Sequence, residues 1–273
     1  MKQHFSSMQP STLSPELQTG KAHYEREGYA IFPHVLNDKL MGEAGRHLDW
    51  LIARNPDRRP EDLQSIVLGI DPFWLRLVSD VRLLDIAQMF IGPDIALFGA
   101  HYFCKPPQDG KAVLWHQDGS YWPLDPMEVV TLWLAVGDVT PENGCLQIIP
   151  GSQTLNLQQM QAATGVDNVL NSQIDPNLVD ESNAVFCAMQ AGGVEVHHPN
   201  IIHGSQPNTS PHRRDAMAIR YIPTSTRITQ TPWETFVLRG QAVAGVNDYA
   251  AAPAFDAERH FEFSGRKDWN LGS

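Results

Sequence analysis

The second half of the chain most constrains its fold. Beyond Pro93 the sequence consists of short apolar runs separated by Gly, Pro, Asn and Asp. Short strands at this spacing are typical of a β-sandwich or barrel and do not fit alternating βαβ units. The predicted strands are 95–104, 129–136, 146–149, 193–196 and 216–222.

The run 129–136 shows what kind of β-structure to expect. Thr131, Trp133 and Ala135 share one face of a strand, and four aliphatic residues share the other. A barrel wall with core on one side and a cavity on the other has this pattern. We therefore expect this strand to separate an apolar core from a cavity.

The N-terminal part carries helix signals. Ser14 suits an N-cap, Pro15 the first helical position and Gly28 a helix stop, while Asn37 can cap a second helix. The predicted elements are helices over about 15–27, 38–53 and 78–91, and a strand over 29–32.

Length and composition set the domain organisation. A chain of 273 residues exceeds the usual ~100–200 residues per domain, but all-β domains reach ~250. We expect a single domain over 1–273, with residues 1–13 mobile. The stretch 152–190 is polar and weakly periodic. It is expected to be an excursion over the barrel mouth, either a substrate lid or a solvated loop.

Charge and cysteine content narrow the class of partner. The net charge of −11 argues against nucleic acid and against an anionic membrane surface. The three cysteines form no C-x-x-C motif, so neither a disulfide framework nor a thiolate zinc site is expected. No signal peptide or apolar span is visible. We expect a cytoplasmic protein, monomeric or homodimeric, that acts on a small molecule.

The strongest local motif is Trp115-His116-Gln117-Asp118. Residues i and i+2 of a strand point to the same side, so His116 and Asp118 can present an imidazole and a carboxylate to one metal ion. An isolated H-x-D pair is common without a metal. The pair therefore indicates a metal site only if further ligands are found elsewhere in the sequence.

A third ligand must come from elsewhere, and His203 is the best candidate. His197 and His198 lie close to it in sequence and compete for this role. Two histidines and one carboxylate form the facial triad of non-haem Fe(II) oxygenases, which leaves three positions for co-substrate and O2. The spacing of Arg214 favours His203 over its neighbours.

Arg214 follows His203 after a turn-forming stretch, 206–211. Two antiparallel strands joined there would bring both residues to one pocket. 2-Oxoglutarate chelates iron through its keto acid end, and its distal carboxylate needs a permanently charged bidentate partner, which arginine provides. Arg213 should face away from the pocket.

These motifs, taken together and in order, resemble the phytanoyl-CoA dioxygenase family of Fe(II)/2-oxoglutarate oxygenases. The resemblance covers roughly residues 28 to 240. The matching segments are 27–33, 115–118, 132–136, 142–152, 203–205, 208–210, 213–214, 220–221 and 238–240.

The resemblance implies a mainly β fold, a double-stranded β-helix (jelly-roll) core with flanking α-helices. It implies iron on His116, Asp118 and His203, and 2-oxoglutarate on Arg214. Three further residues are expected at the co-substrate: Ser205, Trp133 and, on the same strand face, Thr131.

The implied activity is hydroxylation of an unactivated C–H bond, with release of succinate and CO2. Related halogenases have a small residue in place of Asp118, so its presence favours hydroxylation over chlorination. Desaturation, epimerisation or cyclisation of a small metabolite or natural-product intermediate stay open. The candidate residues on the substrate side are His101, Gln117, Ser120, Tyr121 and Trp122.

Two alternatives belong to other classes. A non-catalytic cupin-like module would bind a metal or ligand without turnover, and a zinc hydrolase would use the same three ligands. Both leave Arg214 without a purpose.

Overall fold

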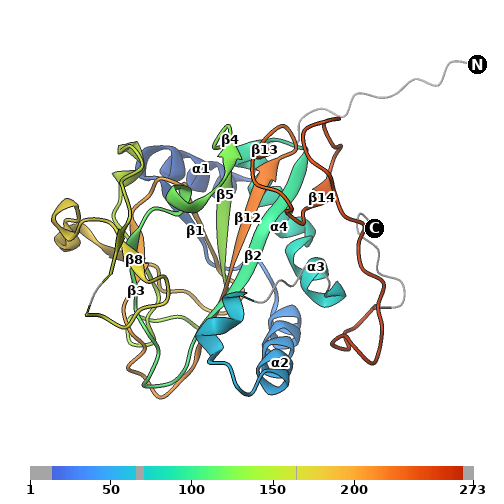
Figure 1. The fold of residues 1–273 in the computed structure, drawn as a ribbon, viewed down its shortest axis with the longest axis horizontal. Helices are drawn as coiled ribbons and strands as arrows, with labels where there is room; N and C mark the ends of the chain where they lie inside the picture. Colours follow the sequence, from blue (N-terminus) through green and yellow to red (C-terminus); the bar gives the residue numbers. More distant parts are fainter. Residues whose placement is uncertain (1–13, 66–70, 164, 267–273) are drawn as a thin grey trace, which may run out of the picture.

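The structure, a computed structural model, describes residues 14–65, 71–163 and 165–266. The expectation for residues 1–13 lies outside these ranges. Four α-helices precede most of the strands among the described residues (Figure 1): α1 (Pro15–Glu27), α2 (Asp38–Arg54), α3 (Pro72–Val78) and α4 (Val81–Ile91).

The predicted caps act as expected on the first two helices. The Ser14 hydroxyl accepts a hydrogen bond from the Leu17 amide, and Asn37 accepts one from the Leu40 amide. Gly28 ends α1 with a φ of 82°, a conformation that favours glycine.

The third predicted helix needs a correction at its start. It begins at Val81, because the Asp80 side chain caps the Arg82 amide. The residues before it form a separate helix, α3, which Asp71 caps and which has proline at its first position. These signals were present in the sequence, although the prediction omitted this helix.

A six-stranded antiparallel sheet forms the centre of the fold. Its order is β1 (Tyr29–Phe32), β10 (Val194–His197), β5 (Val130–Ala135), β12 (Arg214–Pro223), β2 (Ile95–Lys105) and β14 (Phe236–Arg239). Strands 95–104, 129–136, 193–196 and 216–222 are thus confirmed within a few residues.

A four-stranded antiparallel sheet faces it, in the order β3 (Val113–His116), β11 (His203–Ser205), β6 (Leu146–Ile148) and β9 (Val185–Phe186). Two small sheets pair β13 (Arg227–Ile228) with β4 (Leu124–Asp125), and β7 (Gln161–Ala162) with β8 (Ser172–Gln173). Short 3-10 helices complete the described elements: η1 (Pro60–Ser65), η2 (Asp118–Tyr121), η3 (Ser152–Thr154), η4 (Pro176–Leu178) and η5 (Glu181–Asn183).

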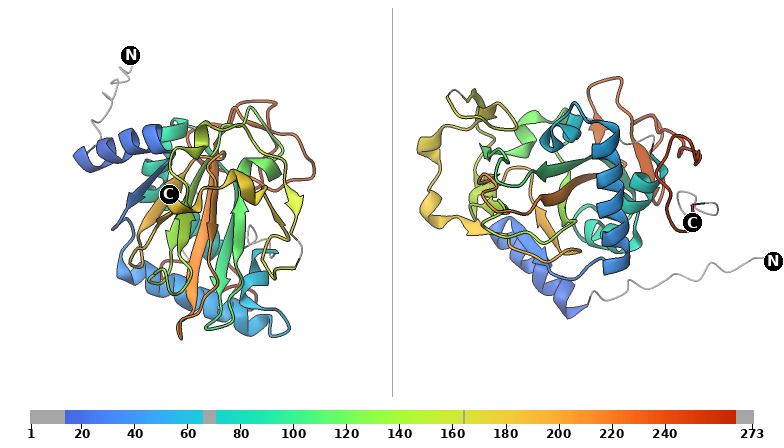
Figure 2. Two further views of the ribbon diagram at one scale, coloured as in Figure 1. Left: turned by 90° about the vertical axis from the view of Figure 1, so that its left-hand side faces the viewer. Right: turned by 90° about the horizontal axis from the view of Figure 1, so that it is seen from below.

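The two faces of β5 pack in two different apolar clusters, whereas an apolar core and a cavity were predicted; on the second face, Trp133 also lines a cavity. Leu132 and Leu134 pack in the cluster formed with α2, α3 and α4, which cover one face of the large sheet. Trp133 and Ala135 pack in a second cluster with β6 of the small sheet. The helices therefore lie outside the paired sheets (Figures 1 and 2), and the predicted fold class is confirmed.

Residues 152–190 leave the small sheet after β6 and return to it at β9. The segment packs against the strand that carries His116. The Ile174 amide donates to the Trp115 carbonyl at 3.0 Å, and the Trp115 indole donates to Glu181 at 2.9 Å. The excursion thus covers one side of β3.

Candidate metal centre and co-substrate pocket

Three side chains converge at the facing ends of β3 and β11. His116 ends β3, Gln117 is extended with φ −118° and ψ 121°, and Asp118 begins η2. Asp118 thus lies just beyond the strand, but the extended Gln117 keeps it on the same side as His116. His203 begins β11 and is the direct cross-strand partner of His116.

The two imidazoles are oriented by backbone carbonyls. His116 Nδ1 lies 2.8 Å from the Leu114 carbonyl, and His203 Nδ1 lies 3.1 Å from the Ile201 carbonyl. Because a carbonyl only accepts, each Nδ1 carries the proton, which leaves the Nε2 lone pair free for a metal ion.

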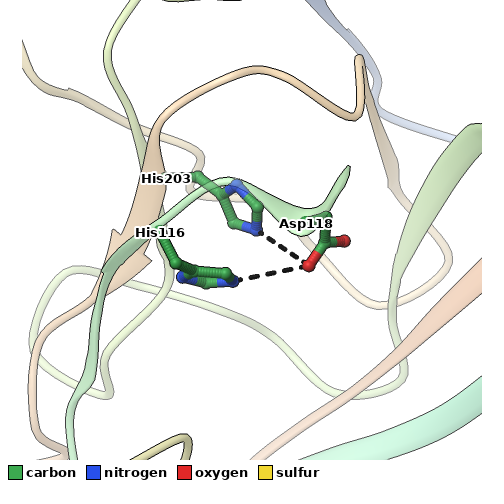
Figure 3. Close-up of side chains that lie close together, drawn as sticks. All are labelled: His116, Asp118 and His203. Carbon is green, nitrogen blue, oxygen red and sulfur yellow. Dashed lines mark ion pairs between the residues drawn. The ribbon is translucent and has the colours of Figure 1, made fainter. Parts of the chain in front are cut away.

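The Asp118 carboxylate divides its two oxygens between two sets of partners. Oδ1 lies 3.5 Å from His116 Nε2 and 3.9 Å from His203 Nε2, so the three side chains point toward one another (Figure 3). One ligand atom from each lies within 4.8 Å of the others. The spacing exceeds a hydrogen bond and suits atoms at ~2.0–2.2 Å from one shared ion.

Burial and charge favour the protonation states that bind a metal. Burial lowers the pKa of His203 well below its usual range, and the neighbouring His116 and His197 add to this effect. Burial alone would raise the pKa of Asp118, but Arg220 and the adjacent histidines outweigh it and hold the pKa well below its usual range. A neutral imidazole and an ionised carboxylate result.

Arg214 is a buried cation without a counter-ion of its own. It is 2% exposed, and burial lowers its pKa to about 10. Its Nη1 donates to the Phe103 carbonyl, its Nε has no hydrogen-bond partner among the described residues, and its guanidinium lies 5.3 Å from the Trp133 ring centre. No carboxylate of the described residues lies within 4.0 Å of it. A buried guanidinium in this state calls for an anion.

The metal triad and Arg214 line one cavity, which is partly open to solvent. The residues therefore fit iron together with 2-oxoglutarate: three hard or borderline ligands for the ion, and a guanidinium for the distal carboxylate. The cavity lining is Phe103, Val113, His116, Asp118, Trp133, Leu146, His197, His203, Ser205, Arg214, Ala218 and Arg220.

The model of one protein family, described as phytanoyl-CoA dioxygenase (PhyH), matches residues 24–216. The chain belongs to this family. The match spans most of the chain and includes His116, Asp118, His203 and Arg214. It confirms the resemblance found in the sequence and the expectation of an enzyme of the 2-oxoglutarate-dependent dioxygenase class.

Relatives and solved structures agree with this membership. L-proline trans-4-hydroxylase of Streptomyces griseoviridis is 27% identical over 246 residues, which cover 81% of this chain and 90% of that protein. The apo structure of the non-haem monooxygenase ThoJ has a TM-score of 0.73 at 22% identity, and covers 85% of this chain and 87% of its own. The epimerase SnoN, solved with Fe3+, alpha-ketoglutarate and nogalamycin RO, has a TM-score of 0.64 at 20% identity, with 79% and 86% covered.

In this family member, Ser205 and Trp133 line the same cavity as Arg214. The sequence predicted that two paired antiparallel strands bring His203 and Arg214 to one pocket. β11 and β12 instead lie in different sheets and do not form a hairpin. Arg213 faces away and pairs with Asp49 and Asp215. Thr131 is buried on the Trp133 face, where its hydroxyl has no hydrogen-bond partner in the part of the chain that the structure describes, but it does not line the cavity.

The predicted substrate-side residues do not line the cavity, and two of them bind the excursion. Gln117 is fully buried; its amide nitrogen donates to the Asn200 carbonyl at 2.7 Å, and its oxygen accepts from the Gln158 amide at 2.7 Å. The Ser120 hydroxyl donates to the Gln158 carbonyl at 3.2 Å. Both side chains therefore hold segment 152–190 against η2.

The three aromatic candidates surround the metal centre at a greater distance. Tyr121 is 43% exposed, its ring lies edge-on to His116 with 6.2 Å between ring centres, and its hydroxyl lies 2.6 Å from that of Ser172. Trp122 is half-buried and packs in a T-shape on Phe98. His101 accepts a hydrogen bond from Arg220, and burial first, then Arg220, lower the pKa of His101 to about 3.

Sequence reasoning missed the charged residues behind Asp118. Its Oδ2 lies 3.7 Å from His197 Nε2 and 3.6 Å from Arg220 Nη2. His197 Nδ1 in turn lies 2.7 Å from the buried Glu195 carboxylate. Residues 195 and 197 share a strand face, and this alternation was the one available signal.

Proposed function

We propose that the chain binds Fe(II) through His116, Asp118 and His203 and hydroxylates an unactivated C–H bond of a small metabolite or natural-product intermediate. The observation that carries this proposal is the buried triad, in which both Nε2 lone pairs and one carboxylate oxygen face the same point. Iron, 2-oxoglutarate and O2 supply the oxidising chemistry when bound, with succinate and CO2 released.

Arg214 binds the distal carboxylate of 2-oxoglutarate in this proposal. Its guanidinium is the only buried cation among the described cavity residues without a carboxylate within 4.0 Å. Ser205 donates its hydroxyl to the same carboxylate, and Trp133 forms the wall beside it. Thr131 stays a predicted co-substrate contact, which its unpartnered hydroxyl supports.

The chain's own contribution is orientation and exclusion of water. Two imidazoles oriented by carbonyls and one carboxylate oxygen would hold the ion, and three protein ligands would leave room on it for 2-oxoglutarate and O2. The segment 152–190, bound to Gln117 and Ser120, closes one side of the site. We propose that it acts as a substrate lid, with Tyr121 and Trp122 at the entrance.

The wider organisation follows the same proposal. The described residues form one paired-sheet core, which supports a single domain over 1–273. None of the described helices is long and apolar enough to cross a bilayer. We expect a cytoplasmic monomer or homodimer, which light scattering and fractionation can test.

Hydroxylation is the favoured outcome because the first relative reported above is a hydroxylase. Desaturation, epimerisation and cyclisation are alternative outcomes of the same chemistry, and SnoN, a structural neighbour, is an epimerase. Product mass divides these outcomes into three groups: hydroxylation adds one oxygen atom, desaturation and oxidative cyclisation each remove two hydrogen atoms, and epimerisation leaves the mass unchanged. NMR of the product then separates desaturation from cyclisation, and chiral chromatography detects the epimer.

The test is turnover without added substrate. Protein purified anaerobically is given Fe(II), 2-oxoglutarate, ascorbate and O2, and succinate is followed for wild type, Asp118→Ala and Arg214→Ala. Arg213→Ala, outside the cavity, serves as the control. Succinate that needs iron and both cavity side chains, but not Arg213, supports the proposal.

The contrary outcome favours a non-catalytic cupin-like module. It consists of no succinate from the wild type, together with no metal-dependent binding of 2-oxoglutarate by calorimetry.

A further inference from the structure

The cavity contains a second buried arginine. Residues 214, 216, 218 and 220 share one face of β12, and both Arg214 and Arg220 line the cavity. Ala216 and Ala218 separate them on this face, and Ala218 lines the cavity as well.

The proposed function holds the keto acid end of 2-oxoglutarate at the metal, which leaves its distal carboxylate for an arginine. The Cα atoms of Arg214 and Arg220 lie about 20 Å apart along the strand, so we assign this single carboxylate to one guanidinium. The proposed function assigns it to Arg214, which leaves Arg220 available.

Arg220 is placed to receive an anion. It is 8% exposed, and its Nε has no hydrogen-bond partner in the described part of the chain. Nη1 donates to His101 Nδ1 at 2.9 Å, a neutral acceptor that gives no counter-charge. The guanidinium also lies over two aromatic rings, those of Phe103 at 5.7 Å and Trp122 at 5.6 Å.

The charges around the metal leave one positive charge unbalanced. Fe(II) and the 2-oxoglutarate dianion cancel, and the Glu195–His197 pair is neutral as a unit. Asp118 then balances one of the two arginines. A buried positive charge without a partner is unfavourable, so the loaded site has capacity for one more negative charge.

We propose that Arg220 binds a carboxylate of the substrate, so that the enzyme acts on small carboxylic acids. This rests on the proposed function, because it needs 2-oxoglutarate on Arg214. The carboxylate accepts from Nε and from the free hydrogen of Nη2, a side-on pair that arginine offers and lysine does not. His101 fixes the opposite edge of the guanidinium.

A competing role for Arg220 is to position Asp118 alone. In that case, substitution of Arg220 lowers the affinity for the metal ion as much as it lowers the affinity for acids or amides. A substrate-binding role instead predicts that the loss concentrates on ligands that carry a carboxylate. The two roles therefore differ in the ratio of affinities for an acid and for its primary amide, which a purely structural role leaves unchanged.

The experiment measures binding to an inactive loaded protein. Wild type, Arg220→Gln, Arg220→Lys and the outward-facing Arg213→Gln are loaded with Ni(II) and saturating 2-oxoglutarate. Calorimetry then gives dissociation constants for Ni(II), for 2-oxoglutarate and for a panel of acids with their primary amides. One arm of the panel holds the standard L-amino acids, and the other holds cyclic and hydroxy acids without an amino group.

The expected result is at least one acid that binds the wild type about tenfold or more tightly than its amide. Arg220→Gln should weaken that acid by about 10- to 100-fold, and Arg220→Lys should restore only part of the loss. Arg220→Gln should change the affinity for the primary amide little, and Arg213→Gln should change the affinity for the acid little. If this acid belongs to the first arm, the carboxylate is that of an amino acid. If it belongs to the second arm, the carboxylate is that of an acid without an amino group.

Three results overturn the proposal. They are equal binding of acids and amides, no binding of any acid to loaded wild type, and an equal loss of Ni(II) and acid affinity in Arg220→Gln. Failure of the proposed function is recognised separately: wild type with Ni(II) then binds no 2-oxoglutarate, or Arg214→Ala binds it as well as wild type.

Discussion

His116 and His203 are direct cross-strand partners on β3 and β11, with ring centres 4.1 Å apart. Directly opposed residues of an antiparallel pair have Cβ atoms only ~4.5–5.5 Å apart. The metal geometry therefore depends on the register of two short strands. Binding of an ion to both imidazoles and to Asp118 should in turn hold these strands together.

Metal binding should raise thermal stability. An ion present at about 100 times its dissociation constant adds about 2.7 kcal/mol, or of the order of 5 to 10 °C in Tm for a chain of this size. Calorimetric scans with Ni(II) and with chelator measure the effect. His203→Ala should abolish the shift, whereas the exposed His212→Ala should keep it; an equal shift in both variants would contradict the assigned ligands.

The part of the site that sequence could predict is local. The H-x-D motif places two ligands by alternation alone, and the caps at Ser14 and Asn37 act within a few residues of their helices. Leu132 and Trp133 likewise point to opposite faces because neighbouring residues of a strand must.

The rest depends on contacts between distant segments. Nothing near Asp118 in the sequence indicates that His197 and Arg220 lie behind it, because both come from strands of the other sheet. Gln117 was expected to face the substrate. Its side chain instead bonds to the backbones of segments that come later in the chain.

The Glu195–His197 pair should make stability depend on pH. Burial alone would lower the pKa of His197, but Glu195 and Asp118 outweigh it and raise the pKa to about 9. A folded pKa above the unfolded value of ~6.5 stabilises the fold fully below pH 6.5, and this contribution is lost as pH rises to 9.

Urea unfolding of metal-free protein at pH 6 and pH 9 tests this dependence. The reference is the double variant Glu195→Gln/His197→Gln, which keeps the size of both groups without titration. Between pH 6 and pH 9, the free energy of unfolding of the wild type should fall by up to about 3 kcal/mol more than that of the double variant. A difference that is the same at both pH values would show that His197 is uncharged in the folded protein.

Gln117→Ala should loosen segment 152–190. The change leaves the Asn200 carbonyl and the Gln158 amide without their partner, at a cost of about 1–3 kcal/mol. Hydrogen exchange should rise around residues 156–158, with weaker metal binding, since Gln117 lies between two ligands. Gln88→Ala, which removes an exposed hydrogen bond from Arg239 outside this segment, is the control. Unchanged exchange in Gln117→Ala would refute this anchoring role.

Gly204→Ala should disturb the metal site through the backbone. A Cβ at Gly204 would lie 2.8 Å from the Val113 carbonyl oxygen and 3.3 Å from the Trp115 ring. Because the closer atom belongs to the backbone of β3, the two strands must move apart, which separates His116 from His203. We expect a loss of about 1–3 kcal/mol in stability and at least about tenfold weaker Ni(II) binding.

The control is Gly45→Ala, on α2, where nothing lies within 4 Å of the added atom. This variant should instead stabilise the fold by up to about 1 kcal/mol. Wild-type metal affinity in Gly204→Ala would mean that the β3–β11 register does not set the ligand geometry.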